Sequence, residues 1–403
     1  MFDMQRVFLL LSTLFALYAC TTTVPHAPVE EKPATLVVPV EEPASATGII
    51  ETPAPETVVI ETPAPVLTLN IDAVPHIALL LPLQSRDYGS AADAVQQGFL
   101  AAARRQSPVL PIRVYSDFDE NNSVVNVYRQ ATASGAKVVV GPLTRNGVST
   151  LAAEQFIPVP TLTLNTVEEK PAPLLYFFGM AAETEARQVA QLAKRQGLRE
   201  AIIVTTRAQF TKRLQSAFEE EWIALGGGIL REIEYNKISG EFADITEMPG
   251  TVIFLAADTK TARLIRPYLP NKLPIYATSQ IFSGNENTLT NYDLNGIRFV
   301  DMPWLLQPDH PAVMAYARAD PPLSIDRERL YALGIDAFRL AQFLLSKRIA
   351  LPLDGVTGDI YLRDHVFQRM ATPAIFQEGR SQLAGASHNP SIQMFPDQVI
   401  VTP

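Results

Sequence analysis

The chain has few of the residues that metal sites, redox sites and nucleic-acid interfaces require. Cys20 is the single cysteine among 403 residues, which excludes a disulfide framework, a thiolate metal cluster and a catalytic thiol in the rest of the chain. The five histidines are scattered without any metal-ligand spacing, so we predict no metal site. Acidic residues outnumber basic ones by 42 to 33, and the net charge is −9. We therefore expect no nucleic-acid partner, because a basic surface is needed to bind phosphate backbones.

The sequence motifs of common enzymes are also missing. The chain contains no Gly-x-Ser-x-Gly elbow, no Walker loop and no Gly-x-Gly-x-x-Gly turn between a strand and a helix. Gly226-Gly227-Gly228 follows an expected helix and does not open one, which is typical of a helix end and not of a phosphate-binding loop. The sequence therefore predicts a protein that is not an enzyme, that has no catalytic residues and that uses no cofactor.

The first 20 residues have the pattern of a lipoprotein signal peptide. Arg6 precedes an apolar run over residues 7–16, which is too short to span a bilayer and has the length of a signal-peptide core. The run ends in Leu17-Tyr18-Ala19-Cys20, which resembles a bacterial lipobox with Cys20 as the lipidated residue. By the same resemblance, Thr21 and Thr22 in place of an Asp retention signal imply delivery to the periplasmic side of the outer membrane. An ordinary signal peptide with a chance cysteine is the alternative.

Residues 21–75 are predicted to form a disordered tether. Ten of these residues are proline, eight are acidic, one is basic and none is aromatic, so the segment has little with which to build a core. The repeated pentapeptide Glu51-Thr52-Pro53-Ala54-Pro55 and Glu61-Thr62-Pro63-Ala64-Pro65 favours extended polyproline II. Because eight acids stand against one base here, the tether carries most of the net negative charge, and residues 76–403 are close to neutral.

From residue 76 onward, short apolar segments alternate with helical patterns. The continuous apolar run over 77–82 is typical of a strand buried on both faces, and it leads into a predicted helix over 91–105. We expect further strands at 112–115, 137–141, 159–164, 175–178, 201–205, 229–233, 251–256, 275–278 and 296–300. Strands that alternate with helices predict an α/β fold with parallel sheets flanked by helices.

Two such series predict two lobes of similar construction. The first covers about 76–180 together with C-terminal segments, and the second covers about 181–295. In this architecture ligands bind in the crevice at the carboxyl ends of the strands, between the lobes. A predicted helix over 327–346 carries apolar residues at helical spacing and should belong to the core. We interpret Asp336 on this helix as a structural acid, paired with an arginine or a capping group, and not as a catalytic carboxylate.

Several sequence phrases resemble one lipoprotein family within the type I periplasmic binding-protein fold. They are Ile77-Ala78-Leu79-Leu80-Leu81-Pro82-Leu83, Val139-Val140-Gly141-Pro142-Leu143-Thr144, Val159-Pro160-Thr161-Leu162-Thr163-Leu164-Asn165, Tyr276-Ala277-Thr278-Ser279, Arg329-Leu330-Tyr331-Ala332-Leu333-Gly334-Ile335-Asp336-Ala337 and Gly355-Val356-Thr357-Gly358. They look like the C-terminal domain of the LppC/LpoA family. That resemblance implies a two-lobed type I periplasmic binding-protein-like fold in an outer-membrane lipoprotein that activates a class A penicillin-binding protein, a bifunctional peptidoglycan synthase. Longer family members carry a helical-repeat domain where this chain has the Pro-rich tether.

The resemblance also implies a set of candidate ligand-binding residues around the cleft. The phrase Gly141-Pro142-Leu143-Thr144 joins a strand end to a helix N-terminus, whose free N–H groups can receive a carboxylate. In amino-acid-binding relatives this loop contacts the ligand. The candidates are Ser85, Pro142, Thr144, Asn165, Thr166 and Ser279. A purely structural role is the alternative for each of them, and for Thr144 that role is a helix N-cap.

Two functions of different classes remain open. In the first, Cys20 anchors the protein to the outer membrane, and the folded domain binds a penicillin-binding protein and favours its active state. Activation then requires tighter binding to the active conformation, because a partner shifts an equilibrium only by preferring one state. In the second, the protein is a periplasmic receptor that closes its lobes around an amino acid or a cell-wall fragment.

Overall fold

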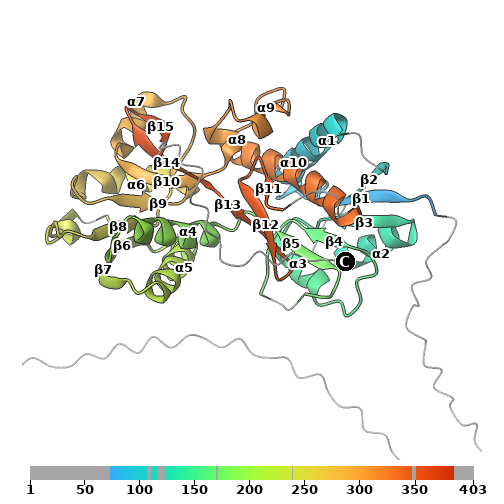
Figure 1. Ribbon diagram of the computed structural model, residues 1–403, viewed down its shortest axis with the longest axis horizontal. Helices are drawn as coiled ribbons and strands as arrows, with labels where there is room; N and C mark the ends of the chain where they lie inside the picture. The colour runs from blue at the N-terminus through green and yellow to red at the C-terminus, as the bar shows by residue number, and fades with distance from the viewer. Residues whose placement is uncertain are drawn as a thin grey trace, which may run out of the picture. The chain divides into compact units, whose positions relative to one another are not determined.

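The computed structural model describes residues 73–106, 110–116, 123–168, 171–237, 239–346 and 351–384. Cys20, the predicted signal peptide and nearly all of the predicted tether lie outside these residues. The described residues form two sheets with helices on their faces (Figure 1). None of their helices is long and apolar enough to cross a membrane.

The first sheet has eight strands in the order β11-β12-β13-β5-β4-β3-β1-β2. The parallel strands are β1 (His76–Leu81), β2 (Ile112–Ser116), β3 (Ala136–Val140), β4 (Thr161–Thr163) and β5 (Leu175–Phe178). The C-terminal part of the chain adds β11 (Leu353–Asp354), β12 (Asp359–Arg363) and β13 (Val366–Met370), of which β13 is parallel to β5 and antiparallel to β12. We call this sheet and its helices lobe 1.

Helices cover both faces of the lobe 1 sheet. All six residues of β1 are buried, because Ile77, Leu79 and Leu81 face one helix layer and Ala78 and Leu80 face the other. The first layer contains α1 (Gly89–Gln106) and α10 (Ile325–Ser346), and the second contains α2 (Val124–Ala133) and α3 (Arg145–Ala152). The short helices α8 (Pro303–Leu306) and α9 (Pro311–Met314) also pack on the first layer. This burial on both faces explains the continuous apolar run of the strand.

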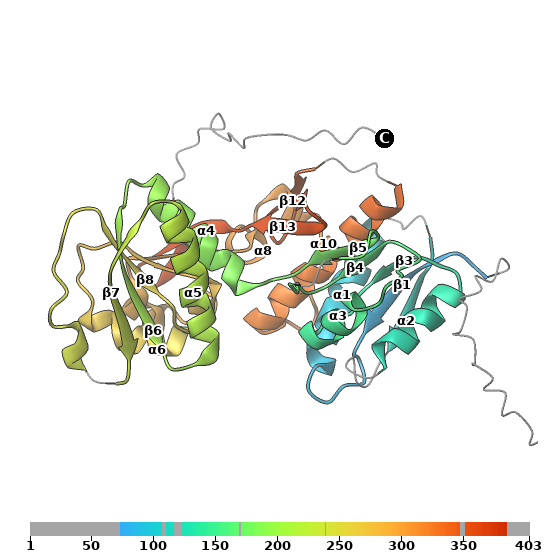
Figure 2. The same ribbon diagram turned by 90° about the horizontal axis from the view of Figure 1, so that it is seen from below.

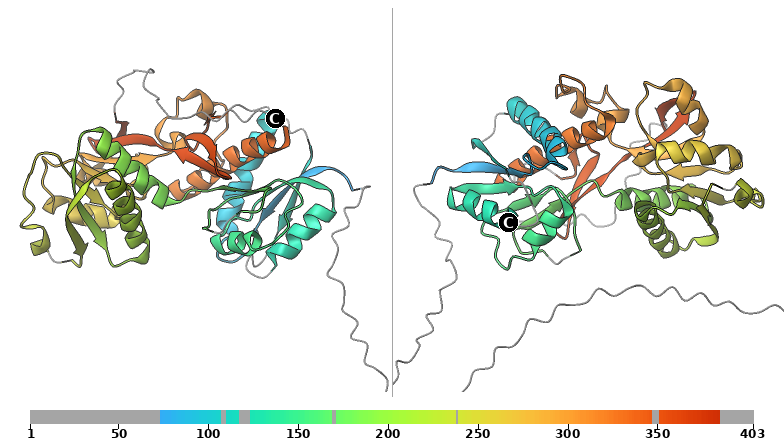
Figure 3. Two further views of the ribbon diagram at one scale, coloured as in Figure 1. Left: turned by 60° about the horizontal axis from the view of Figure 1, so that its bottom comes forward. Right: turned by 180° about the vertical axis from the view of Figure 1, so that it is seen from behind.

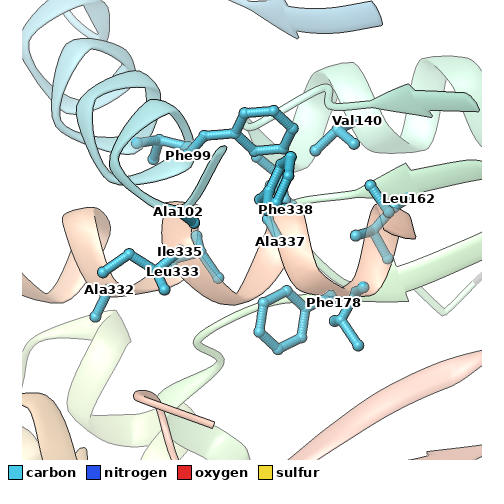
Figure 4. Packing of buried hydrophobic residues seen from close by; sticks show 14 of the residues in the cluster. Phe99, Ala102, Val140, Leu162, Phe178, Ala332, Leu333, Ile335, Ala337 and Phe338 are labelled. Atoms are coloured by element: carbon cyan, nitrogen blue, oxygen red, sulfur yellow. The ribbon is translucent and has the colours of Figure 1, made fainter. Parts of the chain in front are cut away.

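Two glycines allow the backbones of α1 and α10 to touch. A Cβ atom at Gly98 would lie 1.9 Å from the carbonyl oxygen of Tyr331, and one at Gly334 would lie 2.1 Å from that of Val95. Beside this crossing, the rings of Phe99 and Phe338 meet edge to face with their centres 5.2 Å apart (Figure 4). The predicted apolar stripe of the long helix is confirmed as core, since it forms this contact and packs on the sheet.

The second sheet has seven strands in the order β15-β14-β10-β9-β8-β6-β7. Its parallel strands are β6 (Glu200–Thr206), β7 (Gly228–Tyr235), β8 (Thr251–Leu255), β9 (Ile275–Ala277) and β10 (Ile297–Asp301). The hairpin of β14 (Thr372–Gln377) and β15 (Arg380–Leu383) continues the sheet in the antiparallel sense. We call this sheet and its helices lobe 2.

The helices of lobe 2 also form two layers. One layer is made by α4 (Ala182–Arg195) and α5 (Gln209–Ala224), which lie side by side (Figure 2). The other face is covered by α6 (Thr259–Ile265) and the 3-10 helices η3 (Ser279–Ile281) and η4 (Tyr292–Leu294). The helices α7 (Thr288–Asn291) and η2 (Arg266–Tyr268) contact η4, and η1 (Ser239–Phe242) follows β7. The α/β fold class predicted from the alternating pattern is therefore confirmed.

The chain passes between the lobes three times (Figures 2 and 3). The first crossing lies between Phe178, the end of β5, and Ala182, the start of α4. Met302 forms the second crossing between β10 and α8, and Ala371 forms the third between β13 and β14. Each of the last two crossings is a single residue between two regular elements, so few backbone torsion angles are free to change there.

The ten predicted strands correspond to β1 through β10, with boundaries that differ by up to two residues. The sequence did not predict β11 through β15. These strands have two to six residues and carry polar side chains on partly exposed faces, so neither an apolar run nor a clear alternation marks them. They depend on pairing with strands formed far earlier in the chain.

His76 begins β1 and is fully buried. Its Nδ1 lies 2.9 Å from the carbonyl oxygen of Val74, and its Nε2 lies 2.9 Å from the hydroxyl oxygen of Tyr115. Burial lowers the pKa of His76 below its ordinary value, and the positive charge of Arg113 acts in the same direction. The folded protein therefore resists protonation of this ring.

We expect the protein to lose stability as the pH falls below about 6.5, because the unfolded chain then takes up a proton at His76 that the folded chain does not. This one group contributes a slope of at most about 1.4 kcal/mol per pH unit. Urea unfolding on both sides of that pH should show a smaller acid loss for His76→Gln than for the wild type. The same substitution at His310 is the control, and an equal loss in both variants would contradict the assignment.

Candidate functional site

Four of the six candidate residues lie at the carboxyl ends of β3 and β4 in lobe 1. The loops that follow these strands are bonded to each other, since the Leu164 N–H donates to the carbonyl oxygen of Pro142 at 2.9 Å. Asn165 Nδ2 donates to the carbonyl oxygen of Leu143 at 3.2 Å, and its Oδ1 accepts from the Thr166 N–H at 3.0 Å. The structure thus brings Pro142, Asn165 and Thr166 together, and Thr144 begins the helix beside them.

The loop after β3 depends on a glycine and a helix cap. Gly141 has a φ angle of +111°, and a Cβ atom there would lie 1.9 Å from the carbonyl oxygen of Leu80. Thr144 Oγ1 accepts a hydrogen bond from the Gly147 N–H at 3.1 Å, which makes Thr144 the N-cap of α3. The predicted capping role of Thr144 is confirmed, while ligand contact by this residue stays a prediction.

The other two candidates lie elsewhere in the fold. Ser85 is in the loop between β1 and α1, where its Oγ accepts from the Tyr88 N–H at 3.3 Å. Ser279 begins η3 in lobe 2 and is 3% exposed. Its N–H donates to a carboxylate oxygen of Glu185 at 3.0 Å, and its carbonyl oxygen accepts from Arg329 at 3.0 Å. Ser279 therefore takes part in a buried network of charged groups.

Two buried ion pairs lie where the chain crosses between the lobes. Arg369 on β13 and Glu185 on α4 are 2.6 Å apart, with side chains 5% and 6% exposed. Arg329 on α10 and Asp301 at the end of β10 are 2.7 Å apart, with side chains 9% and 1% exposed. Each pair joins an arginine of lobe 1 to a carboxylate of lobe 2. We call these four residues and Ser279, which bonds to both pairs, the junction network.

The donors of Arg329 are well satisfied. Besides Asp301, its guanidinium donates to Asp326 at 2.7 Å and to the carbonyl oxygens of Ser279 and Phe282 at 3.0 and 2.8 Å. Burial raises the pKa of the Asp301 carboxyl above its usual range, although Arg329 acts against this rise. Burial would lower the pKa of Arg329, but Asp301 and Glu185 raise it above its usual value. The arrangement holds a fixed positive charge against a buried carboxylate, which suits a structural role.

Polar side chains also hold two of the crossing residues directly. Gln188 on α4 donates from Nε2 to the carbonyl oxygen of Ala371 at 2.7 Å and accepts from the Ala371 N–H at 3.0 Å. Asp301 Oδ1 accepts from the Met302 N–H at 2.8 Å. The second and third crossings are thus fixed to the same buried layer as the ion pairs.

Asp336 on α10 holds the turn before β12. Its carboxylate accepts from the N–H groups of Val356 and Thr357 at 3.2 and 2.8 Å and from the Thr357 hydroxyl at 2.7 Å. Arg339 lies 3.2 Å from the same carboxylate. Burial raises the pKa of Asp336, while Arg339 and these hydrogen bonds act in the opposite direction. The interpretation of Asp336 as a structural acid is confirmed.

Sequence reasoning named Ser279 but missed the two ion pairs of the junction network, because their partners are distant along the chain. Arg369 and Glu185 are separated by 184 residues, and neither stands in a motif. The one available signal was Arg329, a charged residue within a buried helix segment. In the part of the chain that the structure describes, no group of three or more His, Cys, Asp or Glu side chains is arranged to hold a metal ion.

We expect Arg369→Met to lower the free energy of unfolding by about 3–5 kcal/mol, because Glu185 is then left as a buried charge without its cation. Urea denaturation measures this loss. The matched control is Arg187→Met, which removes an exposed pair with Glu220 whose side chains are 42% and 66% exposed, and it should cost less than about 1 kcal/mol. Similar losses in the two variants would show that the buried pair stabilises the protein no more than the exposed pair.

The chain is similar to proteins of one lipoprotein family. A family model described as "LppC putative lipoprotein" matches residues 60–246 and 241–379. The penicillin-binding protein activator LpoA of Haemophilus ducreyi is 29% identical over 301 residues, which cover 71% of this chain and 50% of that protein. The LpoA of Haemophilus influenzae is 28% identical over 298 residues, with 71% and 51% covered. The chain spans about half the length of these curated relatives.

Comparison with solved structures also finds LpoA. Full-length LpoA from Haemophilus influenzae has a TM-score of 0.67 at 27% identity and covers 79% of this chain, with 60% of that chain covered. The LpoA C-domain has a TM-score of 0.66 at 26% identity, and 77% of this chain covers 100% of it. A structure titled as a putative branched-chain amino acid ABC transporter from Chromobacterium violaceum has a TM-score of 0.65 at 37% identity, covering 75% of this chain and all of that one. The type I periplasmic binding-protein-like fold predicted from the sequence is confirmed.

Proposed function

Because the chain belongs to the LppC lipoprotein family, we propose that it binds a class A penicillin-binding protein and activates it. One observation carries the proposal. The chain covers the whole structure of the LpoA C-domain from Haemophilus influenzae, which is described as a regulator of PBP1A. The part of LpoA that this chain resembles is therefore a complete domain, and a single domain can present a binding surface by itself.

The proposed role needs no catalysis by the chain. The names of its relatives describe activators. The deeply buried carboxylates Asp301 and Asp336 are already bound to arginines and backbone N–H groups, so neither is free to act as an acid or base. The chain then acts through binding alone, by preferring the active conformation of the synthase.

The junction network supports this role. A regulator that selects one conformation of its partner needs a surface with a stable shape, because a surface that becomes ordered only on binding loses binding free energy. In this chain the two lobes are tied by the pairs Arg369–Glu185 and Arg329–Asp301. We infer that surface groups of both lobes are presented to the synthase as one unit.

We expect the full chain to bind saturably to class A penicillin-binding proteins from the same source. Cross-linking of lipid-linked precursor should become faster, by about five-fold for a coupling free energy of about 1 kcal/mol. Binding is measured by surface plasmon resonance and cross-linking by product analysis, with a periplasmic binding protein of another family as the control. Absence of binding to every such synthase would refute the proposal and favour a ligand-binding function.

We also propose the arrangement of the whole chain. Residues 1–20 serve as the signal peptide, residues 21–75 as the tether and residues 76–403 as the domain that meets the synthase. The lipidated Cys20 holds the protein on the periplasmic side of the outer membrane. Fully extended, the tether spans roughly 170 Å, so the domain is able to approach a synthase far from its own membrane.

Cys20→Ser should release the protein from membranes, because it removes the only thiol that can be lipidated. Cell fractionation followed by immunoblotting measures the release. Thr21→Asp is the matched control, and it should keep the protein lipidated but hold it in the inner membrane. Outer-membrane attachment of Cys20→Ser would overturn the anchor.

A receptor function is the second candidate, and one observation favours it. The Chromobacterium violaceum structure that is 37% identical to this chain is described as a putative branched-chain amino acid ABC transporter. In this chain the corresponding ligand would be an amino acid or a cell-wall fragment, bound by Pro142, Thr144, Asn165 and Thr166 at the ends of β3 and β4. A thermal-shift screen with such ligands separates this function from synthase activation.

A further inference from the structure

A pocket of about 330 Å³ lies on lobe 2. It is lined by the C-terminal half of α4 and by the strands β9, β10, β14 and β15. None of the six candidate residues and none of the junction-network residues belongs to its lining. Its volume falls within the range of small-molecule sites.

The pocket exists because the sheet extends beyond the helices that cover it. On this face α4 and α5 pack on β6, β8 and β9 and on Val300 of β10. Four residues of the same face follow one another across neighbouring strands, in the order Tyr276, Arg298, Ile375 and Gln382. Tyr276 lies in the core under α4, whereas the strands of the other three lie toward the sheet edge (Figure 1). Tyr276, Arg298 and Ile375 of this row line the pocket.

Tyr276 supplies an unused hydrogen-bond donor. The residue is 3% exposed, and its hydroxyl has no hydrogen-bond partner among the described residues. Burial raises the pKa of Tyr276, so that the hydroxyl keeps its proton at neutral pH. A buried hydroxyl without a partner is costly, so a bound group that accepts its hydrogen bond would be stabilised.

Arg298 supplies an unused positive charge. Its guanidinium carbon lies 5.7 Å from the centre of the Tyr276 ring. Within the described part of the chain it has no carboxylate at ion-pair distance, and the pocket lining contains no Asp or Glu. The other polar side chains of the lining are Gln196 and Gln377. One cation beside one neutral donor, with no competing acid, is a setting that favours an anion.

We propose that this pocket binds an organic carboxylate that carries an apolar group. The Arg298 guanidinium pairs with the carboxylate, and the Tyr276 hydroxyl donates to it. The apolar group lies against Leu192 and Pro373. The carboxylate belongs either to a small molecule or to the C-terminus of a peptide. This site is separate from the proposed function and does not rest on it.

The test uses the full chain with N-acetyl-leucine and, as its uncharged match, N-acetyl-leucinamide. Isothermal titration should show binding of the acid in the millimolar range or tighter, and binding of the amide about ten-fold weaker or more. Arg298→Gln should weaken binding of the acid about ten-fold. Tyr276→Phe should weaken it several-fold without lowering the melting temperature, because the hydroxyl has no partner to lose.

Arg113→Gln is the charge-matched control, since Arg113 is an exposed residue of β2 in lobe 1. It should leave binding unchanged. Arg298→Lys keeps the charge and tests the paired geometry if Arg298→Gln proves unstable, and it too should bind the acid more weakly. Equal affinity for the acid and the amide, no binding of the acid, or unchanged binding by Arg298→Gln and Arg298→Lys would overturn the proposal.

A second pair of probes separates the two sources of the carboxylate. The tripeptide Ala-Ala-Leu is used with a free and with an amidated C-terminus. Tighter binding of the free tripeptide than of N-acetyl-leucine assigns the site to peptide C-termini, because added residues then make contacts of their own. Weaker binding assigns it to small carboxylates. In both cases the amidated tripeptide should bind about ten-fold more weakly than the free one.

Discussion

Two arginines removed from water hold the lobes together. Burying a guanidinium and a carboxylate costs several kcal/mol for each ion, and this cost is offset only when geometry and hydrogen bonding are good. Arg329 meets that condition by donating to Asp301, to Asp326 and to two backbone carbonyl oxygens. Apolar side chains could fill the same volume with equal stability. The ion pairs instead fix the position of one lobe relative to the other, because a displaced charge would stay buried without its partner.

This constraint bears on how the two lobes can move. Closure around a ligand in a two-lobed protein takes place by changes of φ and ψ in the few crossing residues. Here Ala371 is held on both backbone groups by Gln188, and Met302 is held by Asp301. A large rotation would break these bonds and separate Arg369 from Glu185. The geometry therefore favours a module that presents a constant surface over a receptor that opens and closes widely.

The sequence predicts those parts of the structure that depend on local patterns. A run such as 77–82 indicates a doubly buried strand because every one of its side chains must be apolar, and the cap at Thr144 follows from its place before α3. The crossings and their ion pairs follow no local pattern. Arg329 and Asp301 are 28 residues apart and meet only after β10 and α10 have packed.

The lobe 2 pocket likewise follows no local sequence pattern. Tyr276 and Arg298 are each ordinary strand residues in the sequence. Their proximity depends on the register between β9 and β10, and the open space depends on where α4 ends relative to the added β14–β15 hairpin. The sequence predicts all six candidate residues around one cleft. The structure brings together those after β3 and β4, because the carboxyl ends of neighbouring parallel strands lie at one edge of a sheet.

The distribution of charge places a further condition on any partnership with a synthase. Most of the net charge of −9 lies in residues 21–75, where eight acids stand against one base, so the folded domain has little net field with which to steer a partner from a distance. Association must then rely on short-range contacts and on confinement. The proposed anchor at Cys20 would supply that confinement, because it keeps the domain at a high local concentration near the membrane.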